Sequence, residues 1–573
     1  PRRFKYDRAA RRPVFRRAPR EPVRPAEFTV CWTLRLVCVA TVVCAALTTI
    51  PPVAGDPQVE PTTRESTAQG PRVVSVFPDP IADGDAGEHV VVAPAGASNL
   101  SLSDGETAVS VPPDGPIALS ATPNATRQLV DVPVVEADFA LANGGERLVL
   151  RRNDTVVGRV GYETTNEGER LNATTGRWIP RGLDLRDAVT TGSATATAFV
   201  LPDAPGVPLE TVRGADRRLL LAGYTFASPR VADALLAAVD RGVRVRVLLD
   251  GGPIGGMTTR QRDQLDRLVA GGVDVRLIDG PHARFAYHHP KYAVADTRAL
   301  VMTENWKPAG TGGRGSRGWG VRIRSARTAN ALASVFAHDA DGIDAVQWRD
   351  RRRNASFVEV DAAAGTYDAA FEPATVDVEN VRVLTTPGNA GGELRGSIEA
   401  ANDTIDVIAP RLDPDGPYFE ALVAAAERGV RVRILLSNAW YDEESNRAVV
   451  DRVDRLRADG RPIEARIADP TDRFEKVHAK GAVIDGGTVL LGSLNWNRHS
   501  ARENREVIVE LGGDDPASYY TRVFDADWEA AAGSEAGGGA DGWRVDATLA
   551  AGGVAAVGLA GFVLRRTVAF DAE

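Results

Sequence analysis

Lysine and cysteine are both scarce in this sequence, and each scarcity is informative. Only five of the 68 basic residues are lysines, and four of these lie between positions 291 and 480. All three cysteines fall within positions 31–44. The chain beyond residue 44 therefore has neither a disulfide framework nor a thiolate metal site. A lysine that recurs at a fixed spacing in such a sequence calls for a specific explanation.

Outside the first 27 residues, acidic side chains outnumber basic ones. Those residues carry ten basic and three acidic side chains, a charge of +7, whereas the whole chain of 573 residues carries −9, which leaves −16 for the remainder. An acidic body argues against loose, charge-driven binding of nucleic acid at low salt. The abundance of Asp, Ala, Val and Gly resembles the proteins of salt-loving archaea, so the acidity has a second explanation in the medium.

Both ends of the chain carry apolar segments. Residues 1–55 read as a basic stretch, an apolar run and then small residues, the order of a secretory signal, with an N-terminal membrane anchor as the alternative. No methionine occurs before Met257, which leaves the natural start open. We expect a Gly-rich tether at 531–546 and a transmembrane anchor at 547–566, with Arg565 and its neighbour cytoplasmic. A buried Ala/Gly hairpin is the alternative for the second segment.

Asn-x-Ser/Thr sequons agree with an exported protein, although each one alone is a weak signal. They begin at Asn99, Asn124, Asn153, Asn172, Asn354 and Asn402. With the two ends of the chain, they predict a cell-surface protein whose catalytic part lies outside.

Residues 71–165 show short β-type runs separated by turns rich in Asp, Gly, Pro and Asn. This spacing predicts an all-β, immunoglobulin-like sandwich. The segments VFPDPIADGDAGEHVVV and LVLRRNDTVVGRVGY resemble the lamin-tail family, although His89 stands where an aromatic residue is usual. No catalytic constellation occurs here, so we expect a binding or spacer role.

An internal duplication organises the rest of the chain. The text AVDRGVRVRVLLDGG at 238–252 recurs as AAERGVRVRILLSNA at 425–439. Each copy places an amphipathic helix before an apolar strand, the order of α/β layers with buried strands. We predict two α/β halves, at 195–350 and 378–530, related by a pseudo-twofold axis within a monomer.

The same set of polar residues follows each copy. In the first half it comprises His289, Lys291 and Asp296, then Thr303 and Asn305 on the next strand. In the second half the matching residues are His478, Lys480, Asp485, Ser493 and Asn495. A lone His-x-Lys would be an ordinary strand pattern, but the repeated spacing in a duplicated scaffold is not explained by chance.

These residue types suit chemistry at a phosphodiester. A His and a Lys two residues apart on a strand project from one face, so both can reach one phosphate. Imidazole serves as nucleophile or as acid and base near neutral pH, while lysine offsets the charge of the transition state. The hydroxyls and amides supply neutral donors to the other phosphate oxygens. No cofactor is needed, and no cluster has the spacing of a metal site.

The repeated His-x-Lys-x4-Asp pattern resembles the signature of the phospholipase D superfamily, over about residues 195–530. The resemblance implies a fold of two α/β halves with one site between them and a phosphohistidine intermediate. It implies His289 as nucleophile and His478 as general acid, with Glu506 as part of the trailing motif. The first half departs from the pattern, because Met302 replaces a usual Gly and Gly320 stands where the second carboxylate is expected, so the two roles could be reversed.

Three functions compete. We expect a phosphodiester hydrolase or transferase acting on phospholipid head groups, because a membrane-tethered external site would face lipid. A secreted, metal-independent nuclease is the first alternative. A surface binding protein with a degenerate site is the second, motivated by the departures in the first half. For Asp296 and Asp485, support of the fold and orientation of an imidazole are both open.

Overall fold

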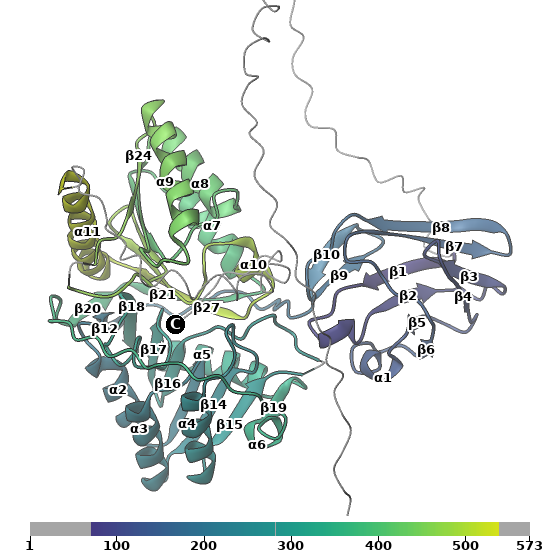
Figure 1. Ribbon diagram of the computed structural model, residues 1–573, viewed down its shortest axis with the longest axis horizontal. Helices are drawn as coiled ribbons and strands as arrows, with labels where there is room; N and C mark the ends of the chain where they lie inside the picture. The colour runs from purple at the N-terminus through teal and green to yellow at the C-terminus, as the bar shows by residue number, and fades with distance from the viewer. Residues whose placement is uncertain (1–69, 281, 471, 538–573) are drawn as a thin grey trace, which may run out of the picture. The chain divides into compact units, whose positions relative to one another are not determined.

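The computed structural model describes residues 70–280, 282–470 and 472–537 (Figure 1). The predicted signal-like segment at 1–55 and the predicted anchor at 547–566 lie outside the described residues. Within the described ranges, no helix combines the length and apolarity that a membrane crossing requires.

The N-terminal region contains two β-sheets around one apolar core. The larger sheet has the order β10-β9-β1-β2-β5-β6 and the smaller β4-β3-β7-β8. Alternation sets the buried face: in β3, Leu100 and Leu102 are buried among residues of both sheets. The first sheet continues past the predicted boundary at residue 165. The elements are β1 (Arg72–Phe77), η1 (Asp83–Asp85), β2 (His89–Ala93), β3 (Leu100–Ser103), β4 (Ala108–Val111), β5 (Ile117–Ser120), α1 (Pro123–Thr126), β6 (Val134–Glu136), β7 (Glu146–Arg152), β8 (Thr155–Tyr162), β9 (Glu169–Asn172) and β10 (Arg177–Pro180).

The first α/β half is built on a nine-stranded sheet of order β19-β15-β14-β13-β16-β17-β18-β12-β20. Strands β13, β14 and β15 pair in parallel, and β16, β17 and β18 pair in antiparallel fashion beside them. The elements of this half are β12 (Ala194–Leu201), α2 (Gly206–Arg213), β13 (Arg218–Gly223), α3 (Pro229–Asp240), β14 (Arg244–Asp250), α4 (Thr259–Ala270), β15 (Asp274–Ile278), β16 (Tyr292–Ala295), β17 (Arg298–Met302), β18 (Gly318–Arg324), α5 (Ala326–Ala340), β19 (Ala345–Gln347) and α6 (Trp348–Arg351).

The second half repeats this arrangement in an eight-stranded sheet of order β11-β21-β27-β26-β25-β22-β23-β24. Strands β22, β23 and β24 are the parallel set, and β25, β26 and β27 the antiparallel set. The elements of this half are β21 (Asn380–Thr386), α7 (Ala390–Ala400), β22 (Thr404–Ala409), α8 (Pro417–Glu427), β23 (Arg431–Leu436), α9 (Glu443–Ala458), β24 (Ile463–Ile467), β25 (Gly481–Ile484), β26 (Thr488–Gly492), α10 (Arg498–Arg502), β27 (Glu506–Gly512) and α11 (Asp514–Gly537).

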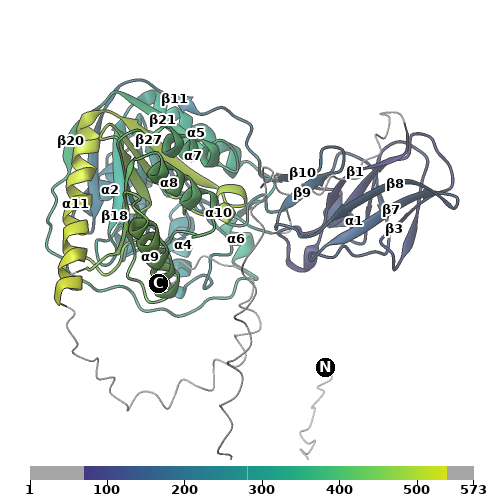
Figure 2. The same ribbon diagram turned by 90° about the horizontal axis from the view of Figure 1, so that it is seen from above.

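Each sheet takes an edge strand from a segment that precedes the other half. Strand β11 (Val189–Thr190) comes before the first half but pairs with β21 of the second. Strand β20 (Ala374–Val378) comes before the second half but pairs with β12 of the first, and α11 packs against it (Figure 2). Helix α11 also continues through residue 537, into the segment predicted as a tether.

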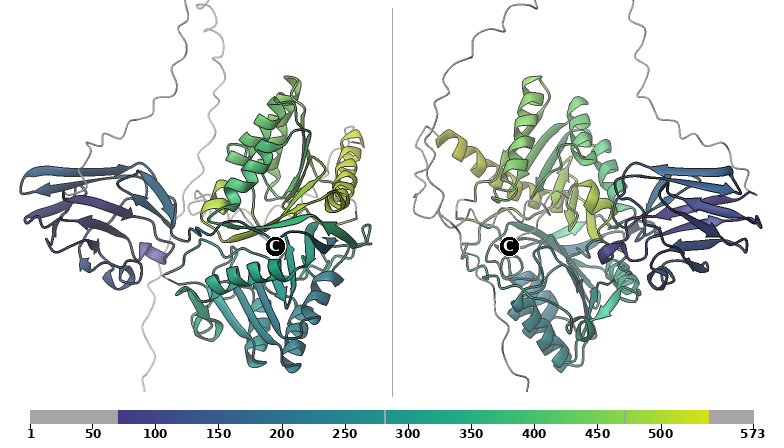
Figure 3. Two further views of the ribbon diagram at one scale, coloured as in Figure 1. Left: turned by 180° about the vertical axis from the view of Figure 1, so that it is seen from behind. Right: turned by 45° about the vertical axis from the view of Figure 1, so that its right-hand side comes forward.

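Helices cover the outer face of each sheet. In Figures 1 and 3, α2, α3 and α4 lie outside the first sheet, and α7, α8 and α9 outside the second. The helix starts follow from the sequence: Ser228, Thr258 and Ser325 cap α3, α4 and α5 by accepting a backbone N–H three residues on. The inner faces of both sheets are consequently left to pack on each other.

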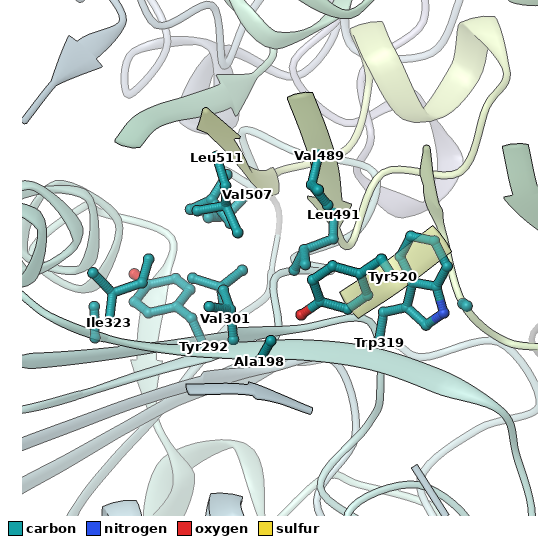
Figure 4. Packing of buried hydrophobic residues seen from close by; sticks show 14 of the residues in the cluster. Ala198, Tyr292, Val301, Trp319, Ile323, Val489, Leu491, Val507, Leu511 and Tyr520 are labelled. Carbon is teal, nitrogen blue, oxygen red and sulfur yellow. The ribbon is translucent and has the colours of Figure 1, made fainter. Parts of the chain in front are cut away.

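A single apolar core joins the two halves (Figure 4). Val301 and Trp319 come from the first sheet and Leu491 from the second, with Tyr520 of α11 between them. The Tyr520 hydroxyl donates to the carbonyl of Gly320 at 2.6 Å, and its ring lies 4.7 Å from that of Trp319. The halves therefore form one folded body, as the pseudo-dimer prediction requires.

Candidate active site

Each motif lies directly before a strand of its half. His289 and Lys291 precede β16, and His478 and Lys480 precede β25. All four side chains are buried, with exposed fractions between 1% and 7%. Lys291 Nζ donates to the carbonyl of His289 at 2.8 Å, and Lys480 Nζ donates to that of His478 at 3.0 Å. The two motifs have therefore nearly the same local conformation.

Each histidine is held by the backbone of the other half. His289 N donates to the carbonyl of Arg505 at 2.9 Å, and Arg505 N donates to that of Tyr287 at 2.8 Å. His478 and Arg317 repeat this pair of bonds with His478 N to Arg317 O at 2.9 Å. Both motifs thus lie at the interface between the halves.

The two arginines that hold these segments are themselves fully buried. Arg505 Nε lies 2.8 Å from Asp339, and Arg317 Nε lies 2.9 Å from Asp527. Neither arginine stands out in the sequence. Because each pair joins a strand start to a helix that packs in the shared core, it fixes the backbone that carries the opposite histidine.

His289 faces a buried carboxylate of the second half. Its Nδ1 lies 2.9 and 3.0 Å from the two oxygens of Glu506, and a carboxylate oxygen accepts, so Nδ1 carries the proton. Asn504 Nδ2 donates to the same carboxylate at 3.0 Å. This arrangement leaves Nε2 as the ring nitrogen for chemistry.

His478 faces a carboxylate that the sequence did not reveal. Nδ1 of His478 lies 3.3 Å from Glu304 Oε2, a longer contact than that of its counterpart. Glu304 belongs to the loop after β17, at the position that Leu494 occupies in the second half. The first half therefore supplies a carboxylate after all, from a neighbouring position.

The strand register corrects the sequence prediction for this carboxylate. Met302 pairs with Gly320, and Gly492 pairs with Ile508, so the residue that corresponds to Glu506 is Gly318 and the choice of Gly320 was wrong. A Cβ on Gly318 would lie 2.2 Å from Glu304 Cγ. The glycine leaves the space that the Glu304 side chain fills. Only the strand pairing reveals this exchange.

The charges around Glu304 keep it ionised. Its burial alone would raise the pKa, but the charge and hydrogen bonding of His478, with Lys480 and Lys307 nearby, hold the pKa of Glu304 below its ordinary value. A signal was present in the sequence, because Glu304 lies between two predicted site residues, Thr303 and Asn305.

The hydroxyl and amide residues of the motifs have different surroundings. Thr303 Oγ1 accepts from Trp319 N, and Ser493 Oγ accepts from Val507 N, both at 3.0 Å, so each hydroxyl ties its loop to the next strand. Asn305 is buried and lines a cavity of about 190 Å³ together with Glu304, Lys307, Tyr441, Lys476 and His478. Asn495 is half-buried. Phosphate contact by these residues stays a prediction.

The two motif aspartates lie at the far ends of their strands. Asp296 accepts from three backbone N–H groups at the start of β13, at 2.7–3.0 Å. Asp485 makes the equivalent three bonds at the start of β22, at 2.8–2.9 Å. Both have a positive φ, of 55° and 50°. Of the two roles left open by the sequence, these contacts favour support of the fold.

Asp250, at the end of β14, gives the fold a pH dependence. It accepts from His288 N at 2.6 Å and from Gly252 N at 2.8 Å, and burial raises its pKa from 3.8 to about 7. The native protein then binds a proton that the unfolded chain releases between pH 4 and 7, so stability falls as pH rises through that window.

Replacement of Asp250 by asparagine should remove this dependence. Because about 3 pKa units correspond to roughly 4 kcal/mol, we expect the unfolding free energy of the wild type to fall by a few kcal/mol relative to Asp250→Asn between pH 4 and 7. Urea unfolding at several pH values measures the difference. Asp415→Asn, at a carboxylate that is 90% exposed, is the control. Parallel curves for wild type and Asp250→Asn would contradict the prediction.

The sequence of both halves matches one family model. Residues 209–340 and 394–528 match the family described as cardiolipin synthase, PLD-like domain. Both segments are similar to that phospholipase D-like domain. They lie within the two predicted halves and carry both histidines. The resemblance to lamin tails and the archaeal-type composition stay predictions.

Curated relatives match over shorter stretches. Mitochondrial cardiolipin hydrolase of Xenopus tropicalis is 29% identical over 109 residues, which are 19% of this chain and 47% of that protein. Cardiolipin synthase of Listeria welshimeri is 34% identical over 110 residues, 19% of this chain and 22% of that protein. The chain thus spans half or less of these relatives' length. Together with the family match, they support an enzyme of the phosphodiester transferase or hydrolase type.

A solved structure is similar over a longer stretch of the chain. Phosphatidylserine synthase of Haemophilus influenzae superposes with a TM-score of 0.44 at 13% identity, over 61% of this chain and 87% of that one.

Among the described residues of the present chain, no three His, Cys, Asp or Glu side chains are grouped in a way that could hold a metal ion.

Proposed function

We propose that this chain hydrolyses or transfers phosphodiesters through a phosphohistidine intermediate, with phospholipid head groups as its substrates. The observation that carries the proposal is the pair of buried His-x-Lys segments, each with its histidine Nδ1 against a carboxylate from the opposite half. Such an arrangement gives one histidine to attack phosphorus and a second to move a proton.

The proposed reaction has two steps. Nε2 of His289 attacks phosphorus, the bond from phosphorus to the leaving oxygen breaks, and His478 donates a proton to that oxygen. Water or an alcohol then loses a proton to His478 and attacks phosphorus, and the bond between nitrogen and phosphorus breaks. Lys291 and Lys480 offset the negative charge on the phosphoryl oxygens in both transition states. Glu506 and Glu304 stabilise the positive charge on their imidazoles.

The choice of phospholipid rests on the chemistry named for the relatives and on the predicted exported, membrane-anchored location. The binding-protein alternative loses its main motive, because Glu304 supplies the carboxylate that the first half lacked. The nuclease alternative is less favoured, because the chain outside the first 27 residues has a net charge of −16. Such a charge disfavours the binding of a polyanion at low salt.

Diester turnover by the full chain tests the proposal. Purified protein in detergent, high salt and chelator is given phospholipid in mixed micelles and, in parallel, single-stranded DNA. We expect head-group release by the wild type and none above background by His478→Asn. Cleavage of DNA alone would establish the nuclease, and no turnover of either would favour the binding protein.

A further inference from the structure

The two flanks of the site differ although the motifs match. The residue two before the motif histidine is Tyr287 in the first half and Lys476 in the second. The residue two after the motif asparagine is Lys307 in the first half and Asn497 in the second. Because the halves are related by pseudo-twofold symmetry, the two additional lysines fall on the same side of the site, beside His478.

The flank beside His289 is aromatic. The ring of Tyr224 lies 4.7 Å from that of His289 and 5.9 Å from that of Tyr287, with Lys291 Nζ 5.5 Å from its centroid. Tyr287 in turn lies 6.1 Å from the ring of His499. These contacts show that Tyr287, His289 and Lys291 project to one side, as alternation along an extended segment requires.

The flank beside His478 is a cavity with several charged side chains in its wall. Lys307, Lys476, Tyr441 and Arg260 line it together with His478, and the carboxylates that reach it besides Glu304 are Glu475 and Asp361. Lys476 Nζ donates to the Tyr441 hydroxyl at 2.9 Å and lies 5.1 Å from the centre of that ring. The tyrosine therefore holds the Lys476 ammonium at the cavity wall. Lys307 and Lys476, with Lys291 and Lys480 of the motifs, are all four lysines among the described residues.

We propose that this cavity is a subsite for a second phosphoryl group, carried by the alcohol that His478 protonates. The inference rests on the proposed function and names a feature of its substrate. Along an extended segment, residues two apart are separated by roughly 6–7 Å, so Lys476 stands about that far along the backbone from His478. This separation suits two phosphoryl groups joined by a linker of two or three carbons. Lysine binds such a group as a point charge, and Arg260 adds a further donor.

A lipid head group fits this subsite better than a neighbouring nucleotide does. Trp440 is 80% exposed, and its ring lies 5.5 Å from that of Tyr441, so an indole stands at the rim of the cavity in contact with solvent. Exposed tryptophan is typical of residues placed at a lipid–water interface. The acidic body, in contrast, disfavours the long polyanion that a nucleic acid presents.

The test compares two matched substrates with the full chain in mixed micelles. Phosphatidylglycerol has one phosphoryl group, and phosphatidylglycerol phosphorylated on its terminal hydroxyl has two. We expect the wild type to favour the second in kcat/KM by about 10-fold or more, since a charge-assisted bond contributes about 1.5–3 kcal/mol. The double variant Lys307→Gln/Lys476→Gln should bring the ratio of the two kcat/KM values close to 1. Tyr287→Phe, at the position equivalent to Lys476, should leave the ratio as in the wild type.

These measurements distinguish failure of the subsite proposal from failure of the proposed function. Turnover with a ratio near 1 in the wild type, or a ratio that the lysine variants do not change, would overturn the subsite alone. A lysine-dependent preference for 5′-phosphorylated over unphosphorylated dithymidine, without lipid turnover, would overturn the lipid assignment. If no diester is turned over, calorimetric binding of glycerol 1,3-bisphosphate against glycerol 3-phosphate decides: a lysine-dependent preference supports the subsite, and equal affinity overturns it.

Discussion

Replacement of His478 by asparagine is expected to lower turnover of an unactivated diester by about 10⁴-fold or more and to leave a phosphoryl group on His289. The variant keeps the proposed nucleophile with its Glu506 partner, 2.9 Å from Nδ1, but lacks the group that protonates the leaving oxygen. A p-nitrophenyl ester needs no such proton, because nitrophenolate leaves readily. It should therefore give a burst of one nitrophenolate per protein followed by almost no turnover.

The measurement is the burst amplitude, together with the mass of the protein at alkaline pH. His289→Asn is the matched variant, because the two histidines have the same backbone contacts and similar burial. It should show neither burst nor added mass. A burst and a modified His478 in the His289→Asn protein would reverse the two roles. Normal turnover by either variant would remove the phosphohistidine route altogether.

Replacement of Glu304 by glutamine is expected to lower turnover by roughly 100-fold or more. The glutamine has nearly the same shape but lacks the charge that faces His478 Nδ1 at 3.3 Å. Without this charge the imidazolium form of His478 is less stable. Because kcat/KM requires protonated His478, the alkaline limb of the pH–rate profile should move to lower pH. The profile of kcat/KM therefore separates a positioning role of Glu304 from simple loss of fold. Glu304→Asp should recover part of the activity.

A double variant tests the origin of this carboxylate directly. Glu304→Leu with Gly318→Glu gives the first half the residues that the second half has at Leu494 and Glu506. We expect it to be more active than Glu304→Leu alone, because a carboxylate returns to the same space by the other strand.

For the single variant, activity of Glu304→Gln within about threefold of the wild type would show that His478 works without a carboxylate.

The sequence predicted those features that depend on local pattern repeated along the chain. Two copies of a helix and strand gave the two α/β halves, and two copies of His-x-Lys gave the candidate histidines. Asp296 and Asp485 belong to the same repeated motif, although only the structure shows the backbone N–H groups that they accept from. These features can be predicted because each is encoded within a few residues.

The features that the sequence did not predict depend on contacts between distant segments. Glu304 aligns with Leu494 and not with Glu506, the carboxylate of the second half. Only the pairing of β17 with β18 shows that Gly318 makes room for the Glu304 side chain. Arg317 and Arg505 resemble the many surface arginines of this chain, and nothing local indicates that they are buried against Asp527 and Asp339. Strands β11 and β20 were not predicted either, because they are short and lie in connecting segments.

The exchange of β11 and β20 makes the two halves dependent on each other. A chain cut between residues 350 and 374 would leave each fragment without an edge strand that the other fragment carries. Each fragment would also hold a histidine without its carboxylate, since Glu506 belongs to one and Glu304 to the other. Neither half is therefore self-sufficient in its present form. The two fragments should regain activity only when they are mixed, by complementation.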